Sequence, residues 1–430
     1  MVGNTFPYTV QDWLEDIELA HVNCIDGFAL NVGREPWQID RVADCFVAAS
    51  RTSTPFKFFF SFDMSSIPSS TEEDIELLCK YLAHFGRSER MLHYSHGIFI
   101  STFAGEQSFF GQSSLDRAWA LVKNRLSAVV RSPIHFVPSL FIDPGSFPKM
   151  KSLNGAFNWN GSWPVHLSSD SSRQEVEVPA LDSDNDYVRN LKSRTMMSAV
   201  SYGFFTHYGI ESWNKNYIYR TDNWLCVRRW EQLIAMRDQV DIVQIISWNG
   251  EYTISGIYVI TDNELLDYGE SHYIGPIKGA QPNSQDWVDG YPHDAWLKMS
   301  SYFIRAFKNG HYPPIEKDQI FVWARPHSKD AQASSDNVPR PENWHLTDDK
   351  LWVVVFSQAP AVVFMHGRTG VQEVNVRPGF TKLSRSLMPG DGIKVVMMRD
   401  GDAVAECSPK GFIFQGYTRV YNFNAFTASS

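Results

Sequence analysis

The first two thirds of the chain alternate short, almost wholly apolar stretches with amphipathic stretches of helical period. Strands with so few polar positions are buried on both faces, as in a parallel sheet that helices cover. The pattern therefore predicts a repeated strand-then-helix domain of the α/β class. The predicted strands lie at residues 25–30, 56–62, 97–103, 134–142, 155–157, 196–205 and 241–247.

A polar or acidic residue lies at or shortly after the end of each predicted strand. These residues are Asn31, Asp63, Glu106, Asp143, Asn158, His207 and Asn249. In a (β/α)8 barrel the carboxyl ends of the strands form the active-site face. We therefore expect a TIM-type barrel over residues 1–312, with seven strands visible and one short of closure.

The pattern changes after Pro313 and Pro314. Short apolar stretches then alternate with turn sequences such as those at 389–392 and 399–402. This arrangement predicts an all-β accessory domain over residues 313–430. Its expected strands lie at 320–324, 351–356, 361–365, 393–398 and 411–414.

Composition excludes several classes of protein. A net charge of −9 argues against a nucleic-acid or anionic-membrane partner, because both favour basic surfaces. No window approaches 18 consecutive apolar residues, so no transmembrane helix is expected. The five cysteines are scattered without a CxxC pair, which fits neither a disulfide scaffold nor a zinc site. Residues 1–8 show no secretory signal, which taken alone indicates a cytosolic protein.

Carboxylates are the strongest candidates for chemistry. The sequence has no phosphate-binding glycine motif, HExxH or GxSxG, so we expect no metal and no cofactor. Asp267 and Glu270 lie three apart in DYGESHY, and on one helical turn both would face the same way. Paired carboxylates suit glycosidic bond cleavage, although a bare DxxE is common and is more often a solvated loop with an N-cap aspartate. Asp63 ends a strongly apolar strand and serves either as a polar strand end or in the site.

Several motifs, in order, resemble glycoside hydrolase family 71, the fungal α-1,3-glucanases or mutanases. The resemblance covers nearly the whole chain. The matching segments are MVGNTFPYTVQDW at 1–13, IDGFALN at 25–31, FKFFFSFDMSS at 56–66, THYGIESWNKNYIYR at 206–220, RRWEQLI at 228–234, DYGESHYIGP at 267–276 and VYNFNAFTASS at 420–430.

This resemblance implies a (β/α)8 barrel followed by a β-sandwich-like domain. It implies hydrolysis of α-1,3-glucan with inversion, and Asp63, Asp267 and Glu270 match the family's essential carboxylates. Asp267 and Glu270 are then the acid/base pair in undecided order, supported by Asp63. The polysaccharide is the expected partner. Residues expected to line the glucan cleft are Asn31, Asn160, His207, Tyr208, Trp248, His272 and Tyr273.

The chain departs from the family pattern at three places. Residues 201–203 read Ser-Tyr-Gly where the family has Ser-Pro-Trp, which suggests a weaker subsite. Seventeen residues, 250–266, separate Trp248-Asn249 from Asp267, which the family joins directly. Their 51 nucleotides permit donor, branch and acceptor signals, so we expect a retained intron translated in frame, with a genuine surface insertion as the alternative.

The third departure is at the start. The family has a signal peptide and a first barrel strand before its MVGN segment, so we expect both upstream of Met1. The resemblance thus indicates a secreted or cell-wall enzyme in place of a cytosolic one. Two alternatives remain open: a non-catalytic glucan-binding relative, and a barrel glycosidase acting on another linkage.

Overall fold

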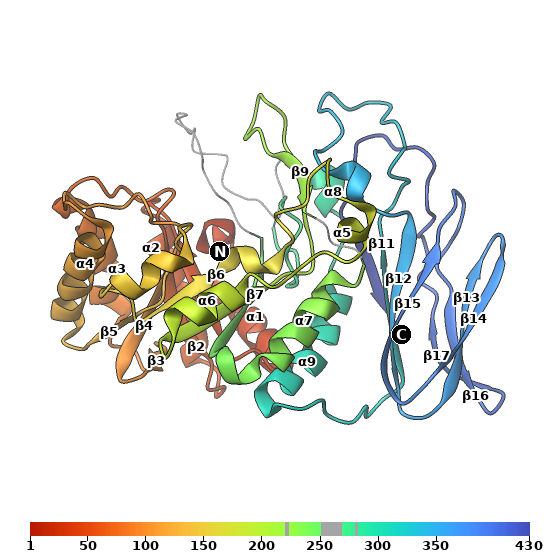
Figure 1. The fold of residues 1–430 in the computed structure, drawn as a ribbon, viewed down its shortest axis with the longest axis horizontal. Helices are drawn as coiled ribbons and strands as arrows, with labels where there is room; N and C mark the ends of the chain where they lie inside the picture. The colour runs from red at the N-terminus through yellow and green to blue at the C-terminus, as the bar shows by residue number, and fades with distance from the viewer. Residues whose placement is uncertain (220–222, 251–268, 280–282) are drawn as a thin grey trace.

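The computed structural model describes residues 1–219, 223–250, 269–279 and 283–430 (Figure 1). Among the described residues, seven parallel strands form the wall of the amino-terminal domain, as the apolar pattern predicts. Five of them follow the predicted stretches with small shifts at their ends, and a sixth, expected over 134–142, ends already at Phe136. The parallel strands are β1 (Gly27–Val32), β2 (Lys57–Asp63), β4 (Gly97–Phe103), β5 (Ile134–Phe136), β6 (Gly155–Asn158), β7 (Thr195–Val200) and β10 (Ile242–Ile245).

Helices alternate with these strands in the chain, and α1, α2, α3, α4, α6, α7 and α9 contribute buried apolar residues to the core that they share with the strands. The helices are α1 (Val10–Val22), α2 (Gln38–Ser50), α3 (Ile75–Phe85), α4 (Leu115–Val130), α5 (Arg173–Glu177), α6 (Asp184–Leu191), α7 (Leu225–Ala235), α8 (Gln285–Val288) and α9 (Asp294–Asn309). Short 3-10 helices are η1 (Val2–Thr5), η2 (Glu72–Asp74), η3 (Pro144–Lys149), η4 (Trp159–Ser162), η5 (Arg237–Gln239) and η6 (Trp344–Leu346), and β3 (His93–Tyr94) is a short antiparallel strand on β4.

The parallel strands form an incomplete barrel wall. Strands β1, β2, β4 and β5 pair in that order, and so do β6, β7 and β10. The N–H of Phe157 joins the two groups by donating to the carbonyl of Pro138 at 2.8 Å. Strands β1 and β10 do not pair with each other, and a cavity of about 500 Å³ lies between them. The described strands therefore curve into a barrel wall that is open at one seam.

The strand expected over 196–205 is confirmed as β7 up to Val200, but its continuation to residue 205 is wrong. The chain leaves the barrel wall after Val200, and β8 (Phe204–His207) instead forms an antiparallel hairpin with β9 (Asn216–Tyr219). Tyr202 marks the break, because its buried hydroxyl lies 2.5 Å from that of Ser300 and accepts a hydrogen bond from Trp230. His207 therefore lies at the far end of a hairpin strand, not at the end of a barrel strand.

Two antiparallel sheets form the carboxyl-terminal domain and share one apolar core. Four of the expected strands are confirmed, but residues 411–414 are not a strand. Strands β14, β15, β17 and β18 were not predicted, because their apolar stretches are short or interrupted. The first sheet is β15 (Gly379–Ser386), β12 (Lys350–Ser357), β11 (Gln319–Ala324) and β18 (Phe426–Ser429), and the second is β14 (Gly370–Val376), β13 (Ala361–Gly367), β16 (Val395–Arg399) and β17 (Asp402–Cys407).

The two domains pack side by side through α7 and α9, which lie between the barrel strands and the first antiparallel sheet (Figure 1). Trp296 and Phe303 of α9 share one buried cluster with Trp323 and Phe356 of that sheet. Trp224 adds a polar contact, because its indole N–H donates to carbonyls of the sheet. Among the described helices, none is both long and apolar enough to span a bilayer.

Candidate active site

Asp63 is the last residue of β2 and is almost fully buried, with 1% of its surface exposed. The Ser65 hydroxyl and N–H both donate to its Oδ1, at 2.5 and 3.0 Å. Burial nevertheless raises the pKa of the Asp63 carboxyl to about 7. The bonds from Ser65 oppose that rise, and the charges of Glu35 and Lys215 act in opposite directions on it. Asp63 thus keeps its proton until near-neutral pH.

Glu270 is equally buried but is held in the opposite protonation state. The Lys215 ammonium lies 2.9 Å from its Oε1, and Nε2 of His272 lies 3.2 Å from its Oε2. Burial is the largest influence on its pKa and acts to raise it. Lys215 and His272 together outweigh burial, so the pKa of Glu270 is lowered. Glu270 is therefore an ionised carboxylate at neutral pH.

The chain just after β10 orients the His272 ring. The Ser247 hydroxyl lies 3.1 Å from Nδ1 of His272, and the Ser247 N–H donates to the His272 carbonyl at 2.7 Å. Because the Glu270 carboxylate can only accept, the His272 proton belongs on Nε2, and Nδ1 accepts from Ser247. This contact fixes one ring tautomer beside the carboxylate.

Lys215 links the two carboxylates. It contacts Glu270 directly, and its charge also acts on the Asp63 carboxyl. Sequence reasoning missed Lys215, because a single lysine among aromatic and polar residues carries no motif. It extends from the turn of the β8–β9 hairpin, so only the fold brings it to Glu270.

Aromatic rings cluster beside Glu270. The ring of Phe204 lies 4.9 Å from that of His272, and Trp163 packs against both. Trp159 contacts Trp163 at 4.7 Å and extends the cluster toward Phe103 at the end of β4. Trp163 and Phe204 are buried, so the half-buried Trp159 is the ring of this cluster that can stack on the apolar face of a sugar.

Three residues expected to line the cleft lie elsewhere, in the packed junction of the two domains. His207 is buried and both ring nitrogens have protein partners. Tyr208 packs edge-on against Trp287, and Tyr273 stacks on His293 while its hydroxyl donates to a backbone carbonyl. These three residues were expected in the cleft because the sequence does not show that the second domain covers the hairpin.

The other four expected cleft residues lie beside Glu270, in η4, or at the cavity between β1 and β10. His272 contacts Glu270, and Asn160 lies half-buried in η4, directly after the end of β6. Asn31 and Trp248 line the cavity between β1 and β10, where Asn31 donates to Ser61 at 3.4 Å. Asp267 lies outside the described residues. Among the described residues, no cluster of three or more His, Cys, Asp or Glu side chains is arranged to hold a metal.

The site supplies buried carboxyl groups in two protonation states. Lys215 acts on both Asp63 and Glu270, and their surroundings move their pKa values in opposite directions. Glu270 is then ionised at a pH at which Asp63 is still protonated. Hydrolysis of a glycosidic bond by carboxyl groups likewise needs one ionised and one protonated group.

Comparison with known proteins identifies the family of the chain. The sequence model of glycosyl hydrolase family 71 matches residues 1–430. A glucan endo-1,3-alpha-glucosidase of Schizosaccharomyces pombe is 32% identical over 99% of this chain and 92% of its own length. The ascus wall endo-1,3-alpha-glucanase of the same yeast is 28% identical over 99% and 94%, and a mutanase of Penicillium rubens is 29% identical over 100% and 87%. The chain belongs to glycosyl hydrolase family 71.

Proposed function

We propose that the protein hydrolyses α-1,3-glucosidic bonds in glucan, with inversion at the anomeric carbon. The observation that carries the proposal is the buried Glu270 carboxylate, held ionised by Lys215 and His272 in a chain whose curated relatives are named for cleavage of this linkage. The substrate is a wall polymer, so we place the enzyme outside the cell.

Glu270 is the better candidate for the base. A base must be ionised before it can take a proton from water, and the two cationic or donor groups on Glu270 favour that state. Asp267 then donates the proton to the leaving oxygen. Asp63, protonated up to near-neutral pH, supports the pair by donating to a sugar hydroxyl. In an inverting enzyme the two acting carboxyls lie about 6.5–9.5 Å apart, which leaves room for water.

A linkage panel tests this function. We expect release of reducing sugar from insoluble α-1,3-glucan, and none from α-1,4-, β-1,3- or β-1,4-glucan. NMR of the first product tests inversion, because the new reducing end should appear as the β-anomer. Binding to α-1,3-glucan without release would favour a non-catalytic glucan-binding protein. Release from another polymer alone would favour a barrel glycosidase of different specificity.

We propose further that residues 250–266 are a translated intron. The flanks of this segment are joined by backbone bonds of their own. The Ile274 N–H donates to the Ser247 carbonyl at 3.0 Å, and the Gly275 N–H donates to the Trp248 carbonyl at 2.8 Å. Neither bond uses a residue of the segment. We expect the mature transcript to join the codon of Asn249 to that of an aspartate; a mature transcript that still encodes the segment contradicts the proposal.

The open seam of the barrel supports an eighth strand. The edges of β1 and β10 face a cavity whose lining includes Phe59, Phe157 and Met197, and neither edge pairs with another strand among the described residues. An inserted parallel strand would pair with both edges and close the ring, which removes an exposed edge prone to aggregation. The same transcript tests this expectation through its 5′ part, which should encode a short apolar strand ahead of the codon for Met1.

A further inference from the structure

A loop of the second domain lies alongside the β8–β9 hairpin of the barrel domain. The Ile218 N–H of β9 donates to the Glu342 carbonyl at 3.0 Å, and the Glu342 N–H donates to the Asn216 carbonyl at 2.9 Å. These bonds make the loop a short parallel partner of β9. The loop also covers the hairpin turn, where a β-carbon added to Gly209 would lie 3.0 Å from Cγ2 of Val338.

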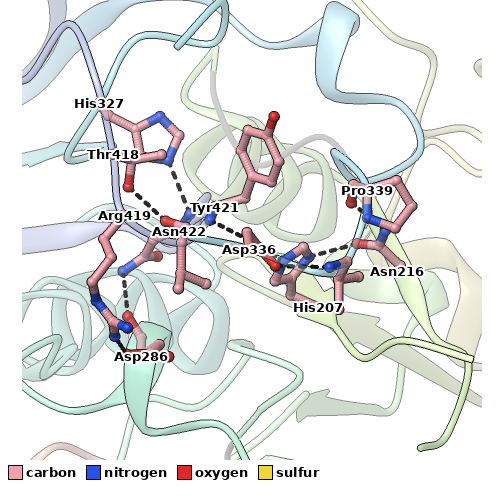
Figure 2. Close-up of polar contacts among 12 residues, drawn as sticks. His207, Asn216, Asp286, His327, Asp336, Pro339, Thr418, Arg419, Tyr421 and Asn422 are labelled. Atoms are coloured by element: carbon pink, nitrogen blue, oxygen red, sulfur yellow. Dashed lines mark hydrogen bonds and ion pairs between the residues drawn. The ribbon is translucent and has the colours of Figure 1, made fainter. Parts of the chain in front are cut away.

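An ion pair anchors the loop to the hairpin (Figure 2). Asp336 Oδ2 lies 2.8 Å from Nε2 of His207 and accepts the Tyr421 N–H at 2.8 Å. The other ring nitrogen of His207 lies 2.7 Å from Oδ1 of Asn216, whose amide nitrogen donates to the Pro339 carbonyl at 2.7 Å. The second domain thus contributes the Asp336 carboxylate and the Pro339 carbonyl to the contacts that hold this end of the hairpin.

The hydrogen-bond pattern fixes the orientation of the Asn216 amide. The Pro339 carbonyl can only accept, so the Asn216 amide must present its nitrogen there and its oxygen to His207. Both ring nitrogens of His207 then face acceptors, one of them the Asp336 carboxylate. The side chains of His207 and Asp336 are 1% and 5% exposed, and removing one member of such a buried pair is strongly unfavourable.

The anchored end of the hairpin carries Lys215. This residue directly precedes Asn216, and its carbonyl accepts the Tyr208 N–H at 2.7 Å. Its ammonium lies 2.9 Å from Glu270. We propose that Asp336 and the loop 336–342 position Lys215 against Glu270. The second domain then contributes to catalysis by holding this lysine in place. The inference rests on the proposed function, because it takes Glu270 as a catalytic group.

Three variants test this positioning role in the full chain. Lys215→Met removes the cation beside Glu270 and should lower kcat on α-1,3-glucan about 100-fold. Asp336→Asn should only displace that cation and should lower kcat about tenfold, since a misplacement of about 1 Å can cost about 100-fold. Both should move the acidic limb of the pH–activity profile to higher pH. Lys215→Met removes the cation that lowers the pKa of Glu270, and Asp336→Asn displaces it, so the pKa of Glu270 should rise in both variants. His272 and Tyr219 remain as titratable neighbours of Glu270. The double variant should be no slower than Lys215→Met, since both changes act through one lysine.

Asp318→Asn is the matched control. Its carboxylate pairs with Arg399 at 2.7 and 2.8 Å, wholly within the second domain. This variant should lower the melting temperature while kcat and the acidic limb stay at wild-type values. If Asp336→Asn gives that same result, or if its loss adds to that of Lys215→Met, the inference is overturned.

A disulfide gives an independent rescue. Cysteines replacing Gly209 and Val338 lie close enough for a bridge, because their β-carbons would fall within the usual separation of about 3.5–4.5 Å. In the Asp336→Asn background, oxidation should restore at least half of the lost kcat, and reduction should remove the gain. Equal activity in both states overturns the positioning role. Wild-type activity in Glu270→Gln would instead show that Glu270 is not a catalytic group, whereas no release from α-1,3-glucan by the wild-type protein would overturn the proposed function itself.

Discussion

Replacing Glu270 with glutamine is expected to lower kcat on α-1,3-glucan about 1,000-fold with little change in glucan binding. The amide keeps the size of the side chain but can no longer take a proton from water. General acid/base groups contribute about 10²- to 10⁴-fold to rate, so a loss near the middle of that range is expected. Reducing-sugar release and pull-down on insoluble glucan measure the two quantities separately.

An activated substrate distinguishes the base from the acid. An α-1,3-linked oligoglucoside with an aryl leaving group needs little protonation of its leaving oxygen. Glu270→Gln should therefore stay about as defective on this substrate as on glucan, because water must still be activated. Recovery to within about tenfold of wild type on the aryl substrate would make Glu270 the acid. The Asp267→Asn variant, as the proposed acid, should show that recovery.

Glu231→Gln is the control for lost charge. Glu231 of α7 pairs with Lys382 of β15, so this variant also breaks a glutamate–lysine contact, away from Asp63 and Glu270. Both glutamine variants leave a lysine without its anion and should lose stability. Only Glu270→Gln should lose turnover at a temperature where circular dichroism shows both variants to be folded.

Much of the fold is predictable because burial leaves a periodic trace in the sequence. β2 reads KFFFSFD and is almost wholly buried, so its apolar run and its terminal Asp63 both identify it correctly. The strand expected over 196–205 extends beyond the observed end of β7 because the apolar pattern continues through Tyr202. Only the tertiary contacts of its hydroxyl show that the chain leaves the barrel wall there. In β14, the residues GVQEVNV are mostly exposed, so the strand has little apolar pattern to detect.

The site is less predictable than the fold because it depends on contacts between distant segments. Glu270 was expected from its motif, but its Lys215 partner lies 55 positions away and carries no pattern of its own. His207 and Tyr273 read as cleft residues because aromatic and imidazole side chains bind sugars in many proteins. In this fold the second domain covers both, and Asp336, 129 positions from His207, uses the ring as an anchor. Neither pairing has a local signal.

Asp63→Asn is expected to stabilise the fold at alkaline pH while lowering activity. The folded pKa of Asp63 is about 7, against an ordinary value of 3.8, so the native state binds this proton more tightly than the unfolded state. Stability from this group is then complete below pH 4 and falls as pH rises toward 7. A shift of about three pH units corresponds to at most about 4 kcal/mol of destabilisation above pH 7.

Asparagine removes this penalty because it resembles the protonated acid and is neutral at every pH. Its carbonyl oxygen can still accept from the Ser65 hydroxyl and N–H. At pH 3, where wild-type Asp63 is protonated in both the folded and the unfolded state, the melting temperatures of the two proteins should therefore agree closely. At pH 8 the variant should melt several degrees higher, and calorimetry across this range measures the crossover. A difference that is equal at pH 3 and pH 8 would show that Asp63 does not titrate in this window.

The activity of Asp63→Asn should move in the opposite direction to its stability. An acidic hydroxyl donor to a sugar is replaced by a weaker amide donor, which should lower kcat/KM about 10- to 100-fold. Asp318→Asn is again the control, since its pairing with Arg399 lowers the pKa of that carboxyl. Its stabilising effect is present above the ordinary pKa and is lost as pH falls, so the control variant should be less stable than wild type at pH 8. Opposite stability changes from two Asp→Asn substitutions at one pH would show that Asp63 is kept buried for catalysis at a cost in stability.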